Sequence, residues 1–98
     1  MSQHETSSNS LFELGQIVAT PGALEALDLG AVNAWVLLRR HQSGDWGDVP
    51  HEDAEENVRS VKRSRRILSS YPLNEDIRIW VITEADRSVT TLLLPEEY

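Results

Sequence analysis

The last quarter of the sequence, residues 77–98, most constrains how this chain can fold. Residues 77–83 (IRIWVIT) are mainly β-branched or aromatic and contain no glycine or proline, which suits a largely buried strand. A polar break at residues 84–88 separates them from a second β-rich run, residues 89–94. That run stops at Pro95, since proline donates no hydrogen bond to a strand ladder. The pattern predicts a β-hairpin.

A third β-rich run lies just upstream, at residues 66–71 (RILSSY), and turn-forming residues 72–76 connect it to the hairpin. The chain therefore ends in a predicted three-stranded antiparallel meander. Before it, apolar residues recur at helical spacing between capping and breaking residues. The three predicted helices cover residues 21–29, 31–42 and 50–63. This order predicts an α+β fold, with two to three short helices on one face of the sheet.

The helix ends and faces follow from particular residues. In the first helix, Thr20 is the expected N-cap, Pro21 the first helical residue and Gly30 the terminator. In the second helix, Trp35 and Val36 belong to an apolar stripe that neighbouring leucines widen, which predicts a well-buried helix.

The third helix begins with acidic residues and ends with basic ones, an order that complements the helix dipole. Its apolar stripe is thin and predicts a surface helix with one face on the core. The stripe consists of Ala54, Val58 and Val61. The basic cluster at residues 62–66 is interpreted as a solvated face or an intramolecular ion network, because it follows several acids in an acidic chain.

The N-terminal part of the chain is less regular. Residues 1–10 contain Met1 as their single large apolar side chain and predict a disordered tail. Residues 11–98 are then a single α+β domain. Residues 11–19 fit a short strand or an extended arm, which would add a fourth, N-terminal strand to the sheet. A helical turn stays open as the alternative.

Both faces of the predicted sheet carry apolar side chains, because alternate residues of a strand point to opposite faces. Three short helices are too few to cover both faces. The second face, which carries Trp80 and Ile82, is therefore a candidate surface for a protein partner or for a homodimer. Cover by the N-terminal arm and tail is the equally weighted alternative.

The composition limits the function classes. The 98 residues carry 16 acids and 9 bases, a net charge of −7, and this disfavours direct binding to nucleic acid, where phosphate contacts supply most of the affinity. An acidic chain suits a basic protein surface. The absence of cysteine excludes disulfides and cysteine-based zinc sites. No apolar run resembles a secretory signal or a membrane span, so we expect a cytoplasmic protein without membrane contact.

Two groups of polar residues are candidates for chemistry. His41, Asp45 and Asp48 surround Trp46 in the loop of residues 43–48 (SGDWGD), where a histidine and two carboxylates can act as a general base or hold a metal. The spacing matches no known ligand motif, and the favoured interpretation is structural, with Asp45 capping the loop and Trp46 closing the core edge. We therefore expect no metal and no cofactor.

The hairpin turn carries the second group. Its acid–base pair and hydroxyls suggest substrate positioning, but Asp commonly bonds backbone N–H groups in turns, so a structural role is again favoured. A nucleophile is missing, because the chain has no cysteine and no serine in a nucleophile elbow. The residues of this group are Thr83, Glu84, Asp86, Arg87, Ser88, Thr90 and Thr91.

The pieces RRHQSGDWGD, RILSSY and IRIWVITEADRSVTTLLLPEEY resemble a family of short proteins found on bacterial plasmids, integrative elements and prophages. Some members are labelled as plasmid-related and some as a subunit of a type I restriction system; this chain has no methyltransferase motif that supports the second label. The resemblance covers residues 20–98. It departs before the RILS strand, where family members carry glycine and this chain has residues 63–66 (RSRR). Its pattern falls on His41, Gly44, Asp45, Trp46, Gly47, Asp48, Asn57, Tyr71, Thr83, Glu84, Asp86, Arg87, Thr90, Thr91, Pro95 and Tyr98.

The resemblance implies mobile DNA as the genomic setting, where small acidic proteins often disarm host defences. The first hypothesis is a non-enzymatic protein binder, such as an anti-CRISPR or antirestriction inhibitor of a nuclease or nucleic-acid-binding defence complex. Its acidic surface would comprise Asp45, Asp48, Glu52, Asp53, Glu55 and Glu56. The alternative is a small ligand-binding module or enzyme. Its site would comprise His41, Trp46, Thr83, Asp86, Arg87 and Thr91. A third hypothesis is a homodimer formed through the second sheet face.

Overall fold

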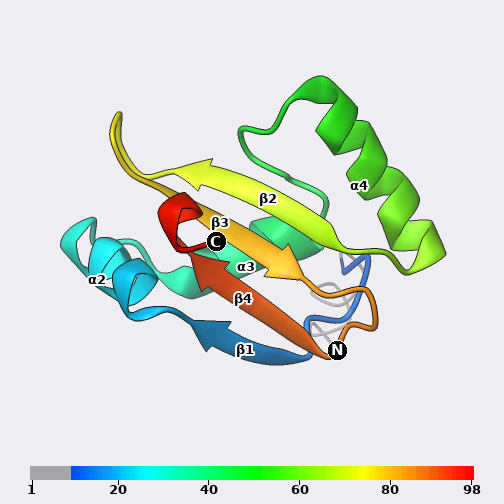
Figure 1. The fold of residues 1–98 in the computed structure, drawn as a ribbon, viewed down its shortest axis with the longest axis horizontal. Coiled ribbons are helices and arrows are strands. Elements are labelled where there is room, and N and C mark those ends of the chain that lie inside the picture. Colours follow the sequence, from blue (N-terminus) through cyan, green and yellow to red (C-terminus); the bar gives the residue numbers. More distant parts are fainter. Residues whose placement is uncertain (1–9) are drawn as a thin grey trace, which may run out of the picture.

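A computed structural model describes residues 10–98; residues 1–9, the greater part of the predicted tail, lie outside the described residues. The fold is α+β, as predicted, with helices packed against an open four-stranded sheet. The sheet order is β1-β4-β3-β2 (Figure 1). The elements are β1 (Gln16–Ala19), α2 (Pro21–Leu29), α3 (Ala34–Gln42), α4 (His51–Arg63), β2 (Ile67–Pro72), β3 (Arg78–Thr83), β4 (Val89–Leu93) and the 3-10 turn η1 (Pro95–Glu97).

The C-terminal meander is confirmed, since β2 pairs antiparallel with β3 and β3 pairs antiparallel with β4. The structure also decides between the alternatives left open for residues 11–19. Their second half is β1, which pairs in parallel with β4 and places Val18 beside Thr91. Just before β1, Gly15 has a φ of +67° and lies so close to the carbonyl groups of Arg87 and Ser88 that a Cβ would clash with them.

The helices form one layer behind the sheet in Figure 1, with α4 set to one side, next to β2. Both α2 and α3 pack on the sheet face that carries Ile79 and Val81. A second, smaller cluster connects the N-terminal arm and α4 to the start of β2 through Phe12, Trp46 and Ile67. The main core consists of Ala23, Ala26, Leu27, Leu37, Leu38, Tyr71, Ile79, Val81 and Leu92.

The start of α2 is as predicted, because the Thr20 hydroxyl accepts a hydrogen bond from the Ala23 N–H at 3.1 Å and Pro21 occupies the first turn. Its end differs in conformation. Gly30 keeps a right-handed conformation with φ −84°, and the left-handed residue is Ala31, with φ 54°. The predicted end of the helix at Gly30 is therefore confirmed, but the left-handed position falls on the next residue.

The second helix begins at Ala34, three residues later than predicted, because Asn33 caps it by accepting a hydrogen bond from the Trp35 N–H at 2.8 Å. The predicted burial of Trp35 and Val36 is wrong, since their exposed fractions are 57% and 53%. The buried residues of α3 are Leu37, Leu38 and His41. His41 is polar, so a search for apolar periodicity does not find it. Hydrogen bonds satisfy this histidine inside the protein.

The third helix, α4, matches its prediction to within one residue, but its core face is different. Asn57 and Ser60 are buried, while Ala54 and Val61 are half-buried and Val58 is 51% exposed. The predicted apolar stripe is therefore wrong at its middle position, because the polar residues Asn57 and Ser60 take inward positions and the Asn57 side chain bonds to the Leu68 backbone.

Within residues 10–98, the C-terminus covers the second sheet face and the N-terminal arm does not; the tail of that expectation lies outside the described residues. The N-terminal arm lies on the helix side, where Leu11 N–H donates to the Gln42 carbonyl at 2.9 Å. It is the C-terminus that returns across the second face, as η1 does in Figure 1. Tyr98 packs edge-on against Trp80 with ring centroids 5.7 Å apart, and Arg66 donates to the Tyr98 hydroxyl at 2.7 Å.

Candidate functional site

His41 is the centre of a buried chain of hydrogen bonds. Its side chain has no exposed surface, and its Nδ1 lies 2.6 Å from the Ser69 hydroxyl and its Nε2 2.9 Å from the Thr83 hydroxyl. Thr83 in turn lies 2.7 Å from the Thr90 hydroxyl, which donates to the Leu14 carbonyl at 2.7 Å. The chain of bonds thus connects α3, all three strands of the meander and the N-terminal arm.

The end of this chain determines the direction of every bond in it. A carbonyl only accepts, so the single hydroxyl proton of Thr90 goes to Leu14. Thr83 must then donate to Thr90, and His41 Nε2 must donate to Thr83. The neutral Nε2–H tautomer leaves Nδ1 as the acceptor for Ser69. All donors are used, which leaves no ring nitrogen for a substrate or a metal.

The electrostatics of His41 agree with this arrangement. Burial, with a smaller effect of the Arg87 charge, lowers the pKa of His41 to about 3. Its ring is also enclosed by aromatic neighbours: Phe12 lies edge-on at 5.2 Å and Trp46 at 6.1 Å between centroids. His41 is therefore a neutral core histidine. The predicted role of Trp46 in closing the core edge is confirmed.

The loop of residues 43–48 is held by its two aspartates. Asp45 accepts from the Gly47 N–H at 3.2 Å, as predicted, and forms an ion pair with Arg40 at 2.7 Å. The Arg40 guanidinium holds the pKa of the Asp45 carboxyl below its usual value. Asp48 forms an ion pair with Arg78 at 3.0 Å. Both carboxylates thus have arginine partners, which weakens their contribution to an acidic surface.

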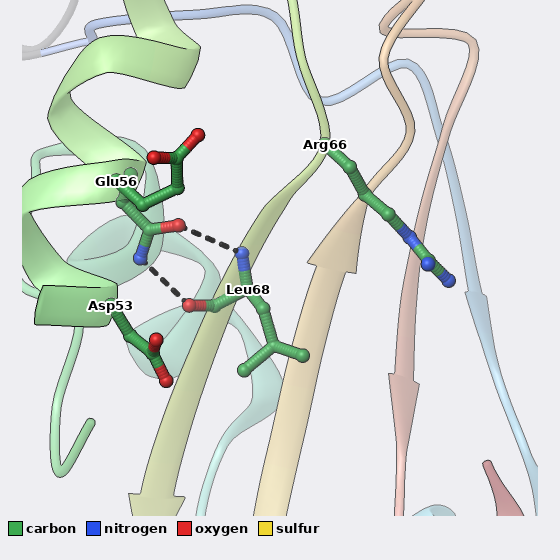
Figure 2. Close-up of a pocket in the computed structure, with 5 residues that line it drawn as sticks. Asp53, Glu56, Arg66 and Leu68 are labelled. Carbon is green, nitrogen blue, oxygen red and sulfur yellow. Dashed lines mark hydrogen bonds between the residues drawn. The ribbon is translucent and has the colours of Figure 1, made fainter. Parts of the chain in front are cut away.

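The same loop closes the outer edge of β2. Ser70 N–H donates to the Trp46 carbonyl at 3.0 Å, and Asp48 N–H donates to the Ser70 carbonyl at 2.6 Å. Two residues earlier in β2, the Asn57 side chain pairs the outward backbone groups of Leu68 in the same way. Its amide donates to the Leu68 carbonyl at 2.8 Å and its oxygen accepts from the Leu68 N–H at 3.2 Å (Figure 2, dashed lines). The outward backbone groups of Leu68 and Ser70 are therefore all paired.

Arg87 ties the hairpin turn to the end of α4. Its guanidinium donates to the carbonyls of Glu84, Ala85, Arg65 and Ser60 at 2.7–3.2 Å. It also lies 5.5 Å from the centroid of the Phe12 ring, on which His41 packs as well. The turn and the loop therefore meet at one aromatic ring, but this meeting point is filled and Arg87 is engaged with backbone.

The remaining residues of the predicted ligand site are dispersed. Asp86 is exposed and accepts from the Ser88 N–H at 3.0 Å and the Ser88 hydroxyl at 2.6 Å, and these bonds lower the pKa of its carboxyl. Its predicted role in the turn is confirmed. Thr91 is opposite Ile82, on the sheet face away from His41. The structure thus brings together His41, Trp46 and Thr83 but leaves Asp86 and Thr91 apart from them.

The acids of the predicted acidic surface are all exposed on or near α4. Glu56 forms ion pairs with Arg59 and Arg65, in line with the predicted ion network, and Glu55 lies 3.2 Å from His51. Among residues 10–98, Glu52 and Asp53 have no ion-pair partner.

A shallow hollow of about 260 Å³ lies between α4 and β2. Figure 2 shows the carboxylates of Asp53 and Glu56 on its helix side, the Leu68 side chain at its base and Arg66 extending away across the sheet. Asn57 completes its lining. The hollow is open, and its one amide is already bonded to β2. Its other lining groups are two carboxylates on the helix side, the apolar Leu68 floor and Arg66.

A comparison with family models, curated proteins and solved structures finds no match to this chain. None of the helices within residues 10–98 has the length and apolar character that a membrane-spanning helix needs. In the same part of the chain, histidine and carboxylate side chains do not gather in a group of three or more that could hold a metal ion.

Sequence reasoning missed the roles of Asn57, Ser60 and Ser69. Each is a polar residue at a buried position of an amphipathic helix or a β-rich strand. A polar residue at a position expected to be buried is the signal that the sequence offers. It predicts a hydrogen-bonded polar group, but the partner lies far along the chain and cannot be identified from nearby residues.

Proposed function

We propose that this protein acts by non-enzymatic binding to a basic protein surface, through the acidic outer side of α4. The observation that carries this proposal is a contrast in how the polar residues are used. The side chains of His41, Arg87 and Thr83 form hydrogen bonds inside the protein, whereas the acids at the start of α4 face solvent. The outer side of α4 therefore presents charged groups that are free for recognition.

The contact surface we propose is narrower than the one expected from the sequence. Asp45, Asp48 and Glu56 each have an arginine partner, which offsets their charge. Glu52 and Asp53 have no such partner among the described residues, and Glu55 faces a histidine. These three acids lie in the first two turns of α4, and Asp53 also lines the hollow above Leu68. A cationic side chain with an apolar stem fits such a surface.

The class of partner follows from the charge and from the family resemblance. A net charge of −7 steers the chain toward basic protein surfaces, which include those of nucleases and other nucleic-acid-binding complexes. The resemblance to plasmid and prophage proteins favours a host defence complex among them. An anti-CRISPR or antirestriction inhibitor is thus the specific form of the proposal.

The ligand-binding alternative has less support. It needs an accessible site where the loop of residues 43–48 meets the hairpin turn. That place is occupied by the Phe12 ring, with buried His41 on one side and the Arg87 guanidinium on the other.

The test is a binding experiment with the tagged 98-residue protein in bacterial lysate, followed by mass spectrometry at low salt and at about 0.5 M salt. We expect one basic complex to be retained at low salt and lost at high salt, because screening shortens the range of surface charges to a few Å. Direct titration with the recovered complex then gives the dissociation constant.

The deciding variant carries Glu52→Gln, Asp53→Asn and Glu55→Gln. Its matched control carries Glu25→Gln, Asp28→Asn and Glu96→Gln, which remove the same charge from exposed acids of α2 and η1. The α4 variant should weaken binding at least tenfold, while the control should weaken it much less. Equal effects of both variants, or unchanged binding by the α4 variant, would reject α4 as the contact surface.

A further inference from the structure

Within residues 10–98, the backbone groups on the outer side of β1 have no partners. Gln16 N–H donates to the Ser88 carbonyl at 2.9 Å and Thr20 N–H donates to the Leu92 carbonyl at 3.0 Å, so the even-numbered residues bond to β4. Ile17 and Ala19 therefore direct their N–H and C=O groups away from the sheet. β1 is the last strand in the sheet order, and Figure 1 shows no element of residues 10–98 beyond it.

This edge lacks the usual protection. Exposed strand edges in proteins are commonly blunted by charges, proline or bulges, because they otherwise pair with another chain. The sequence of β1 is QIVA, with neither charge nor proline, although charged residues make up 26% of the chain. The opposite edge of the same sheet is closed by Asn57 and by the backbone around Gly47. Shortness is the one protective feature that β1 has.

We infer that β1 pairs with β1 of a second copy of this chain, antiparallel, about a two-fold axis at Val18. In this register, the outward N–H and C=O groups of both Ile17 and Ala19 form hydrogen bonds. Ile17 exchanges two hydrogen bonds with the partner subunit's Ala19, and Ala19 exchanges two with the partner subunit's Ile17. The two four-stranded sheets then form one continuous sheet.

The side chains suit this pairing. Val18 is 38% exposed and, at the axis, meets the partner subunit's Val18 as a non-hydrogen-bonded pair, the closer of the two antiparallel pair types. Gln16 comes opposite the partner subunit's Thr20. No carboxylate therefore faces a carboxylate across the strands, although each copy carries a net charge of −7. An uncharged edge offers no attraction specific to a charged foreign strand, which favours the second copy as the occupant.

The dimer has a recognisable dependence on salt and concentration. Four backbone hydrogen bonds support a weak association, with a dissociation constant on the order of 1 mM. Salt screens the repulsion between the two acidic copies and should strengthen the dimer. Binding to a basic partner through α4 responds to salt in the opposite direction. Since α4 is next to β2 at the other side of the sheet, either proposal can fail without the other.

The experiment is sedimentation equilibrium of the full chain up to millimolar concentration, at low salt and at about 0.5 M salt. The first variant is Ala19→Pro, which removes an outward donor and leaves the ladder to β4 intact. Proline is tolerated there because the missing N–H faces solvent and the preceding residue is extended. It deletes two of the four bonds and should weaken the dimer at least tenfold.

The second variant is Val18→Lys, which places two ammonium groups side by side at the axis. Its matched control, Val58→Lys, makes the same change at an exposed valine of α4. A dimer that strengthens with salt, is lost in both β1 variants and persists in the control supports the inference. A monomer under all conditions overturns it, as does a dimer that both β1 variants retain. Val18→Lys keeps the test valid if Ala19→Pro fails to fold, which circular dichroism will show.

Discussion

The two edges of the sheet are built in opposite ways. At β2, the outward groups of Leu68 and Ser70 are paired by an asparagine side chain and by the backbone of the loop around Trp46. At β1, the outward groups of Ile17 and Ala19 have no partner within residues 10–98. One edge is closed by polar residues from two other segments, and the other edge is left open by a short, uncharged strand.

This difference shows where the conspicuous residues of the sequence are used. The loop of residues 43–48, with its paired glycines and aspartates, serves mainly to close the β2 edge and to enclose His41. Its polar groups are therefore architectural. The open edge and the outer side of α4 carry no conspicuous motif, yet both stay available to other molecules within residues 10–98.

The largest loss of stability is expected from the removal of His41, which the loop beside the closed β2 edge encloses. The substitution His41→Ala leaves a cavity and deprives the Ser69 and Thr83 hydroxyls of their partner. We expect the free energy of unfolding to fall by about 3–5 kcal/mol, from the cavity and the unpaired groups together. Urea denaturation followed by circular dichroism measures this change. A loss below about 1 kcal/mol would show that the hydrogen-bond chain does not support the fold.

Low pH should also destabilise the protein through His41, without any mutation. The pKa of His41 is lowered to about 3 in the folded protein, below its ordinary value of 6.5, so the unfolded chain binds more protons between these pH values. The stability that this histidine contributes is fully present above about pH 6.5 and is lost as the pH falls toward 3. Its slope is at most about 1.4 kcal/mol per pH unit.

Urea denaturation between pH 7 and pH 4 gives the slope, and two histidine variants separate its sources. His51→Gln changes an exposed histidine at the start of α4 and should retain the wild-type slope. His41→Gln should flatten it. If both variants keep the wild-type slope, carboxylates and not His41 cause the loss of stability in acid.

The sequence predicted the elements well and their inward faces less well. The meander, the cap at Thr20 and the extent of α4 follow from local signals, namely β-branched runs, a capping hydroxyl and charge order. The parallel pairing of β1 with β4 joins segments more than 70 residues apart, and no local pattern specifies it. The structural roles of Asp45 and Asp86 were predictable, because both act within their own turns.

The errors share one physical cause. Apolar periodicity assumes that inward residues are apolar, but here His41, Asn57 and Ser60 point inward and Trp35 and Val58 stay exposed. Burying a polar side chain is tolerated when its hydrogen bonds are satisfied, and the partners of His41 and Asn57 come from strands that follow later in the chain. Neither partner is visible from the sequence near each residue.

Removal of the Asn57 side chain should make the closed β2 edge resemble the open β1 edge, with the smallest expected loss of stability. Asn57→Ala removes both hydrogen bonds to the Leu68 backbone. Water can replace part of what is lost through the open hollow, and alanine is the better helix former, so the free energy of unfolding should fall by only about 1 kcal/mol. The Leu68 amide should then exchange its hydrogen at least roughly tenfold faster, whereas the amide of buried Ile79 should speed up only about fivefold, as the loss of global stability requires. Val58→Ala, a control for helix propensity at an exposed site of α4, should leave the Leu68 amide unchanged. An unchanged exchange rate in Asn57→Ala would mean that α4 covers the edge by its bulk, and the asparagine would then not be what distinguishes β2 from β1.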